Sequence, residues 1–164
     1  MRIRNAEIAD LAAIAEVEAL CFPVAEAATR DEFRRRLSSY AKHFWLLFEE
    51  EPTGERLVSF VDGMVTDEAD LTDEMYEHAE LHNPNGNWQM IFGVNTIPEY
   101  RRKGYAGLLI ERAVSDARSQ GRKGVVLTCK EALIHYYEKF GFVNEGVSES
   151  VHGNVTWYQM RLKF

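Results

Sequence analysis

The chain has 164 residues, of which 46% are hydrophobic and 12% aromatic, and its formal net charge at pH 7 is −7. This length and composition suit one well-buried domain and exclude a disordered chain or two ordinary domains. The acidic balance argues against nucleic acid as the main partner, because binding to a phosphate backbone needs a basic face.

The two cysteines, Cys21 and Cys129, lack metal-ligand spacing and predict free thiols in a reducing compartment. The first residues show no signal-peptide pattern, and no apolar run approaches membrane-spanning length. We therefore expect a cytoplasmic protein with no metal ion and no membrane partner, existing as a monomer or a homodimer.

The first quarter of the chain predicts a strand and two helices. Residues 2–4 form the expected strand, and Asn5 resembles the cap of a first helix that Pro23 ends. Thr29 and Glu32 have the spacing of a capping box, which opens a second helix to about residue 37. The core face of the first helix is expected at Ile8, Leu11, Ile14, Val17 and Leu20.

An aromatic hairpin and an acidic segment follow. Residues 44–48 and 57–65 predict two paired strands around a polar turn. From Asp67 to Glu80 there are seven carboxylates and no Lys or Arg. Such a run is either a solvated surface or a mobile flap that gathers a cationic substrate.

The last half alternates strands and helices. Strands are expected at 89–94 and 125–129, with a helix at 106–119 between them. A helix at 132–139 and strands near 143–150 and 155–162 complete the pattern. The predicted order is two helices, then a hairpin, then a strand–helix–strand unit. This order predicts a mixed α/β fold of the α+β type with a partly parallel sheet.

The segment 101–107 is rich in small and basic residues. It follows the apolar run at 90–94 and precedes the helical pattern that begins at residue 108. Unpaired N–H groups at a helix start favour anions, and the small residues at 104, 106 and 107 would let a diphosphate approach the main chain. Either this segment is a pyrophosphate cradle or it is an ordinary loop with a solvated cap.

Three short motifs follow one another along the second half of the chain. Arg101-x-x-Gly104-x-Ala106 is preceded by Phe92-Gly93-Val94 and followed by the segment from Tyr137 to Phe142. With these motifs in this order, the chain resembles the GCN5-related N-acetyltransferase family. Cys21-Phe22-Pro23 and the stretches at 57–63, 67–72 and 81–86 make it similar to the serotonin (arylalkylamine) branch.

The resemblance implies one N-acetyltransferase domain over residues 1–164, with a mostly antiparallel central sheet and a splayed parallel strand pair flanked by helices. It implies acetyl-CoA as co-substrate and no metal. The strand would pair with the pantetheine arm, and the loop would hold the diphosphate. The implied cofactor-binding residues are Phe92, Gly93, Val94, Arg101, Arg102, Lys103, Gly104, Tyr105, Ala106 and Gly107.

The chemistry needs an acid for the departing thiolate and a neutral amine. Tyr137 matches the family tyrosine that protonates the coenzyme A sulfur, although a core tyrosine on an amphipathic helix is the plainer interpretation. Where the serotonin-acetylating branch carries two histidines, this chain has Trp88 and Met90, and neither accepts a proton at neutral pH. Replacement bases acting through water are Glu26, Asp62, His82, Glu131 or His135.

The sequence therefore predicts acetyl transfer to a primary amine by direct attack in a ternary complex. The acceptor is a small cationic amine, an arylalkylamine or a polyamine, with Glu26, Asp62, Trp88 and Met90 as candidate contacts. Two alternatives stay open: acetylation of a peptide N-terminus or lysine, and a coenzyme A-binding regulatory module without turnover.

Overall fold

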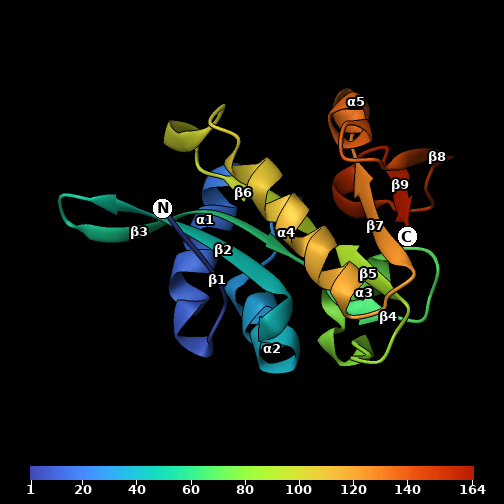
Figure 1. The fold of residues 1–164 in the computed structure, drawn as a ribbon, viewed down its shortest axis with the longest axis horizontal. Coiled ribbons are helices and arrows are strands. Elements are labelled where there is room, and N and C mark those ends of the chain that lie inside the picture. The colour runs from blue at the N-terminus through green and yellow to red at the C-terminus, as the bar shows by residue number, and fades with distance from the viewer. The chain divides into compact units, whose positions relative to one another are not determined.

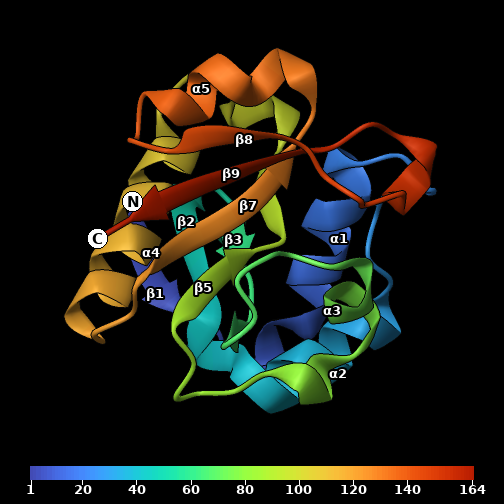
Figure 2. The ribbon, with the colours of Figure 1, turned by 90° about the vertical axis from the view of Figure 1, so that its right-hand side faces the viewer.

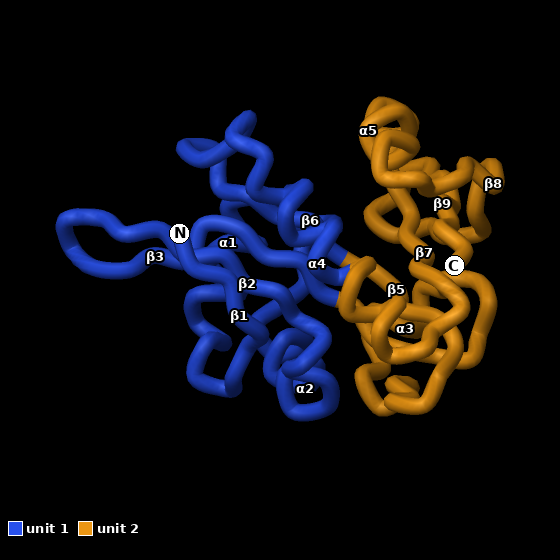
Figure 3. Tube along the Cα trace, viewed as in Figure 1, with its two compact units in different colours: residues 1–62, 93–113 blue, residues 63–92, 114–164 orange.

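The computed structural model describes all residues, 1–164. The chain divides into two compact units (Figure 3). Unit 1 contains Met1–Asp62 and Gly93–Ala113, and unit 2 contains Gly63–Phe92 and Val114–Phe164. The chain therefore passes from one unit to the other three times.

Unit 1 is built on a sheet with the strand order β1-β2-β3-β6, in which all neighbours are antiparallel. Its strands are β1 (Arg2–Asn5), β2 (Phe44–Glu51), β3 (Gly54–Asp62) and β6 (Gly93–Thr96). Every side chain from Phe44 to Phe48 is buried, so both faces of β2 are covered there. The short strand β6 ends the sheet.

Two helices lie on one side of this sheet (Figures 1 and 2). Helix α1 (Leu11–Cys21) packs on β3 and β6, and α2 (Arg30–Tyr40) packs beside α1. The predicted capping box is confirmed, because Thr29 accepts from the Glu32 N–H and Glu32 accepts from the Thr29 N–H. The single turns η1 (Ile8–Asp10), η2 (Ala41–His43) and η4 (Pro98–Tyr100) complete the unit.

Aromatic rings form the centre of the unit 1 core. Phe33 on α2 meets Phe44 and Phe60 edge-on, with ring centroids 6.2 and 5.9 Å apart. All three side chains are fully buried. Each such ring contributes about 2 kcal/mol of burial energy or more, so this cluster fixes the helix pair on the sheet.

The predicted core face of α1 is partly wrong. Ile8 and Leu20 are 55% and 49% exposed, and the buried positions are Leu11, Ile14, Val17 and Glu18. A strict three-residue spacing turns 300° per step, so it drifts away from the core over the four steps from Ile8 to Leu20. The seven-residue step from Leu11 to Glu18 instead returns to the same face.

The cap of this segment also differs from the expectation. Glu7 and Asp10 form the capping box of η1. The Asn5 side chain instead donates to the carbonyls of Lys42 and Phe44, at 3.1 and 3.0 Å. It therefore ties the end of β1 to the start of β2.

Unit 2 is built on a second sheet, with the strand order β4-β5-β7-β9-β8. Only the β5–β7 pair is parallel. The strands are β4 (Val65–Thr66), β5 (Trp88–Ile91), β7 (Gly124–Cys129), β8 (Val143–Val147) and β9 (Tyr158–Lys163). The mixed, mostly antiparallel α/β fold is confirmed, with its strands in two sheets.

The helices of unit 2 are short. They are α3 (Asp73–Glu77), α5 (Ile134–Glu138) and the turns η3 (Ala79–Leu81), η5 (Glu131–Leu133) and η6 (His152–Asn154). Helix α5 packs on β8 and β9. The longest helix, α4 (Tyr105–Ser119), begins in unit 1 and ends in unit 2. No helix combines the length and apolar character needed to cross a bilayer.

Two predicted strands are each divided in the structure. The strand expected at 89–94 is β5 and β6, which belong to different sheets and are separated by Phe92. The strand expected at 57–65 ends at Asp62, and β4 follows. Gly63 permits this break, because a Cβ there would lie 1.8 Å from the Met90 carbonyl oxygen. The helix expected at 132–139 is likewise η5 followed by the short α5.

Candidate active site

The glycine loop precedes α4 in unit 1 and is exposed from Arg101 to Gly104. Arg102 and Gly104 both adopt positive φ, at 63° and 81°. A Cβ added at Gly104 would meet nothing within 4 Å, so the space in front of the main chain is open. The first backbone bond of the helix runs from Leu108 N–H to Gly104 O, at 3.1 Å. The preceding N–H groups have no partner within the helix and are free to bind an anion.

Side chains of the loop anchor it to the sheet of unit 1. Tyr100 OH donates to Glu51 at 2.7 Å, and Tyr105 OH donates to Glu49. Arg101 Nε donates to the Thr96 carbonyl at 2.8 Å, which gives this arginine a structural contact. Arg102 is exposed and has no side-chain partner in the structure.

Strand β6 adjoins this loop. It pairs with β3 on one edge, with Asp62 opposite Gly93 and Val61 opposite Val94, and no strand of its sheet follows on the other edge. An edge strand presents main-chain N–H and C=O groups to an extended ligand. Phe92, which precedes the strand, places its ring 5.0 Å from that of Tyr76 within unit 2.

Gly93 lies against two buried carboxylates. A Cβ at this position would be 3.1 Å from Asp62 Oδ1 and 3.7 Å from Glu18 Oε1. Asp62 also forms a fully buried ion pair with Arg36, at 3.0 Å. Glu26, the other candidate contact in unit 1, is half-buried in the connector between α1 and α2.

Tyr137 lies in α5 of unit 2, with 6% of its surface exposed. Its ring packs edge-on against Tyr136 and Phe142, and its hydroxyl makes no hydrogen bond. Burial, with smaller effects of Cys129 and Tyr136, raises the pKa of the phenol well above its usual value. The group therefore keeps its proton at neutral pH and is able to donate it.

Cys129 is buried in β7, and both cysteines of the chain are free thiols. Burial raises the pKa of the Cys129 thiol to about 11. A thiol that stays protonated at neutral pH is a poor nucleophile, so its surroundings disfavour an acyl-cysteine route.

Trp88 and Met90 lie on the parallel strand β5. The Arg161 guanidinium carbon is 4.6 Å from the centre of the half-buried Trp88 ring. Met90 is fully buried. Neither environment supplies the proton acceptor that the histidines of the resembled branch would provide.

The other candidate bases of unit 2 have different surroundings. His82 accepts the Val65 N–H at Nδ1, 3.0 Å away, and so holds the 82–87 turn on β4. His135 has a 96% exposed side chain that contacts Glu138. Glu131 is exposed at the start of η5.

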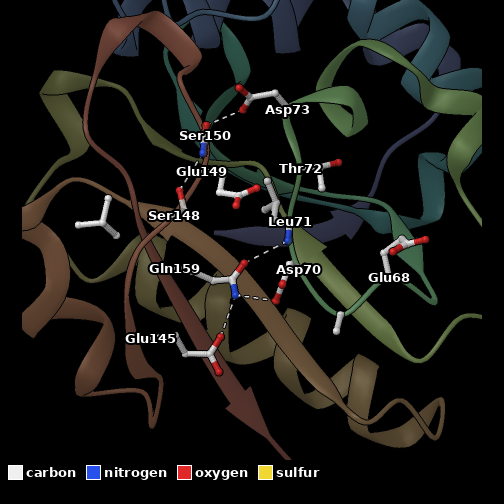
Figure 4. Close-up of a pocket in the computed structure, with 12 residues that line it drawn as sticks. Glu68, Asp70, Leu71, Thr72, Asp73, Glu145, Ser148, Glu149, Ser150 and Gln159 are labelled. Carbon is white, nitrogen blue, oxygen red and sulfur yellow. Dashed lines mark hydrogen bonds between the residues drawn. The ribbon is translucent and has the colours of Figure 1, made fainter.

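Unit 2 also contains an acidic cavity of about 650 Å³ (Figure 4). Three of its carboxylates are used internally: Asp73 accepts from Ser150 at 2.5 Å, and Asp70 and Glu145 accept from Gln159 at 2.9 and 2.8 Å. The Gln159 side-chain oxygen also accepts a hydrogen bond from the Leu71 N–H. The acidic segment is therefore bonded to the last hairpin. No three metal-ligating side chains are grouped to bind a metal ion.

Glu18 is the residue that sequence reasoning missed. It occupies the apolar face of α1, seven residues after Leu11, and it is 6% exposed. A carboxylate at that position of an apolar face was the available signal, because acidic residues are almost never fully buried without a partner.

Comparison with known proteins gives one consistent family. The family model described as acetyltransferase (GNAT) family matches residues 11–142. The serotonin N-acetyltransferase of Mesocricetus auratus is 30% identical over 125 residues, which cover 73% of this chain and 59% of that protein. The match thus spans less than two thirds of that relative.

Solved structures share the fold at low sequence identity. The GphF GNAT-like decarboxylase, solved with isobutyryl-CoA, has a TM-score of 0.83 at 23% identity and covers 99% of both chains. The loading GNATL domain of CurA from Lyngbya majuscula has a TM-score of 0.82 at 17% identity, covering 99% of this chain and 96% of that one. At these identities the likeness concerns the fold alone.

Proposed function

Because the chain belongs to the acetyltransferase (GNAT) family, we propose that residues 1–164 form one N-acetyltransferase domain. It moves the acetyl group of acetyl-CoA to a primary amine by direct attack in a ternary complex. The acceptor is a small cationic amine, an arylalkylamine or a polyamine.

The glycine loop is the observation that carries this proposal. It combines two positive-φ residues, open space at Gly104 and a helix start with unpaired N–H groups. The free guanidinium of Arg102 adds a charge that suits a diphosphate. Edge strand β6 offers main-chain groups for the amides of the pantetheine arm.

Tyr137 supplies the acid in this proposal. As the thioester carbon–sulfur bond breaks, the phenol gives its proton to the departing sulfur. Its protonated state at neutral pH and its lack of another hydrogen-bond partner are compatible with that role. The raised pKa of Cys129 supports direct attack by the amine over a covalent intermediate.

The amine class is supported by two observations. The relative matched at 30% identity is named for serotonin, an arylalkylamine. The cavity of unit 2 is lined by Glu68, Asp70, Asp73, Glu145 and Glu149, and the first and last of these have no side-chain partner. An acidic surface raises the local concentration of a cation.

The test is release of free thiol from acetyl-CoA in the presence of a panel of arylalkylamines, polyamines and short peptides. We expect release with small primary amines and not with peptides. Release with peptides alone would contradict the amine class. Tight acetyl-CoA binding without release for any acceptor would contradict turnover and favour the regulatory module.

A further inference from the structure

Two carboxylates from different elements of unit 1 converge on one backbone position. Glu18 comes from α1 and Asp62 from the end of β3, and they are 6% and 1% exposed. Both approach the place where Gly93 would carry a Cβ, at 3.7 Å for Glu18 Oε1 and 3.1 Å for Asp62 Oδ1. Gly93 lacks a side chain where these groups lie, and a larger residue would displace them.

The pair has too few partners for two negative charges. Glu18 Oε2 accepts the Ala28 N–H at 2.9 Å, and Asp62 Oδ2 accepts from Arg36 Nη1 at 3.0 Å. The oxygens that face Gly93, Glu18 Oε1 and Asp62 Oδ1, are buried and have no partner in full hydrogen-bond geometry, and the polar side chain beside them is the Asn95 amide. One arginine therefore serves two carboxylates, and the carboxylate that it does not bind directly is Glu18.

Burial, followed by repulsion from Asp62, raises the pKa of Glu18 to about 7. The Ala28 N–H, the Arg36 guanidinium and the Asn95 amide oppose this rise only in part. Cys21, the neighbouring thiol on α1, has its own pKa raised by burial and adds no charge. A carboxylate with such a midpoint both takes up and releases a proton near neutral pH.

We propose that Glu18 is the proton acceptor for the acceptor amine, acting through a water molecule beside Gly93; this inference rests on the proposed function. Gly93 begins the edge strand that we assign to the pantetheine arm, and its Cβ position is met by the Asn95 amide nitrogen at 3.0 Å as well as by Glu18 Oε1 at 3.7 Å. The unpaired oxygen is directed at the strand that would carry the reacting thioester. Glu18 thereby replaces the histidines that Trp88 and Met90 exclude.

The proton balance of the step is complete. The ammonium form of the amine loses one proton to the Glu18 carboxylate and becomes neutral. Its nitrogen attacks the thioester carbon, so the carbon–nitrogen bond forms and the carbon–sulfur bond breaks. Tyr137 protonates the sulfur and regains a proton from the amide nitrogen, and Glu18 releases its proton to solvent.

The experiment compares Glu18→Gln with Glu16→Gln, an exposed control on the same helix. We expect Glu18→Gln to lower kcat for an alkylamine by about 100-fold or more while acetyl-CoA affinity stays unchanged. The wild-type kcat should level off above about pH 7, whereas the residual rate of Glu18→Gln should keep rising toward the amine pKa of about 10. Glu16→Gln should match the wild type in both respects.

A second substrate separates proton transfer from structural damage. Trifluoroethylamine is already neutral at pH 7 and needs no base before attack. The deficit of Glu18→Gln should therefore shrink by at least about tenfold with this amine, which a misplaced helix would not produce. Glu18→Asp, which keeps a carboxylate, should retain the wild-type levelling of kcat with pH.

Wild-type turnover and an unchanged pH profile in Glu18→Gln would overturn the role of Glu18 and leave the proposed function intact. An equal deficit with both amines would also overturn it, because the loss would then be structural. Failure of the wild-type protein to acetylate any amine would overturn the proposed function and this inference together.

Discussion

Each unit contains a cluster of two carboxylates and one arginine. The carboxyl pKa is raised in the cluster of unit 1 and lowered for Glu145 in the cluster of unit 2. In unit 1, Arg36 binds Asp62 and acts on Glu18 only through its charge, and burial raises the pKa of both carboxyl groups. In unit 2, Asp70 and Glu145 share Arg161, where the arginine contact lowers the pKa of Glu145.

Exposure and hydrogen bonding explain the difference. The Asp62 and Arg36 side chains are 1% and 4% exposed, whereas those of Asp70 and Glu145 are 72% and 33% exposed. In unit 2 the Gln159 amide also donates to both carboxylates, at 2.9 and 2.8 Å. The same residue types therefore make a group that titrates near neutrality in one unit and a permanent ion pair in the other.

Removing each arginine is expected to give the largest effect. Arg36→Met should cost about 3–5 kcal/mol of unfolding free energy, because it leaves two buried carboxylates without their cation. Arg161→Met should cost about 1 kcal/mol, since water reaches Asp70 and Glu145. Urea denaturation at pH 7 measures both. Equal losses would show that burial does not distinguish the two clusters.

The pH dependence of stability should differ in sign between the clusters. The folded-state pKa of Glu18 is raised from 4.5 to about 7. The native state therefore holds this proton more tightly, and its stabilising effect is lost as pH rises through that range. Relative to Glu18→Gln, the wild type should lose about 2–3 kcal/mol between pH 5 and pH 8.

For Glu145 the folded pKa is lowered, so its contribution is present above the unfolded value and is lost as pH falls. The difference between the wild type and Glu145→Gln should therefore grow as pH rises through the ordinary carboxyl range. Urea denaturation across pH 4–8 follows both pairs. If the unfolding free energies of Glu18→Gln and Glu145→Gln, each relative to the wild type, changed with pH in the same direction, the environments assigned to Glu18 and Glu145 would be contradicted.

Tyr137 tests whether a protonated phenol is the acid of the reaction. Tyr137→Phe should lower kcat by about tenfold, equivalent to about 1.4 kcal/mol, with acetyl-CoA affinity unchanged. The ring and its packing against Phe142 are kept in this variant. Steady-state kinetics with calorimetric binding measures the two quantities, and a wild-type kcat would exclude the acid role.

The smallest effect is expected at the unpaired carboxylates of the acidic cavity. Glu68→Gln and Glu149→Gln should each raise KM for a cationic amine by about twofold, because exposed charges act weakly through water. KM for a neutral analogue at the same pH should stay constant. Effects that match for both amines, or that persist in high salt, would reduce these residues to ordinary surface positions.

Local features were predictable from the sequence, and pairings between distant segments were not. The Thr29 capping box and the order of strand, glycine loop and helix depend on neighbouring residues, and the structure contains them. The division of 89–94 into two strands depends on β3 and β7, which are remote in sequence. Glu18 acquires its environment only when α1, β3 and β6 meet, so no local pattern gives its titration.

The acidic segment shows the same limit. Its carboxylates suggested either a solvated surface or a substrate-gathering flap. Asp67 accepts from the Asn87 N–H, Asp73 accepts from Ser150, and Asp70 binds Arg161 on β9. These partners lie up to 91 positions away in the chain. The charge count was visible in the sequence, but the partners that use the charges were not.

Calorimetric titration of coenzyme A into the wild type, Gly104→Glu and Gly121→Glu tests the central claim most directly. Gly104 and Gly121 have nearly equal φ, 81° and 80°, and both face open space, so the two substitutions impose the same backbone strain. We predict wild-type affinity for Gly121→Glu and a loss of at least about 100-fold for Gly104→Glu, which places a carboxylate in the diphosphate cradle. Equal affinity in all three proteins would contradict the assignment of the loop.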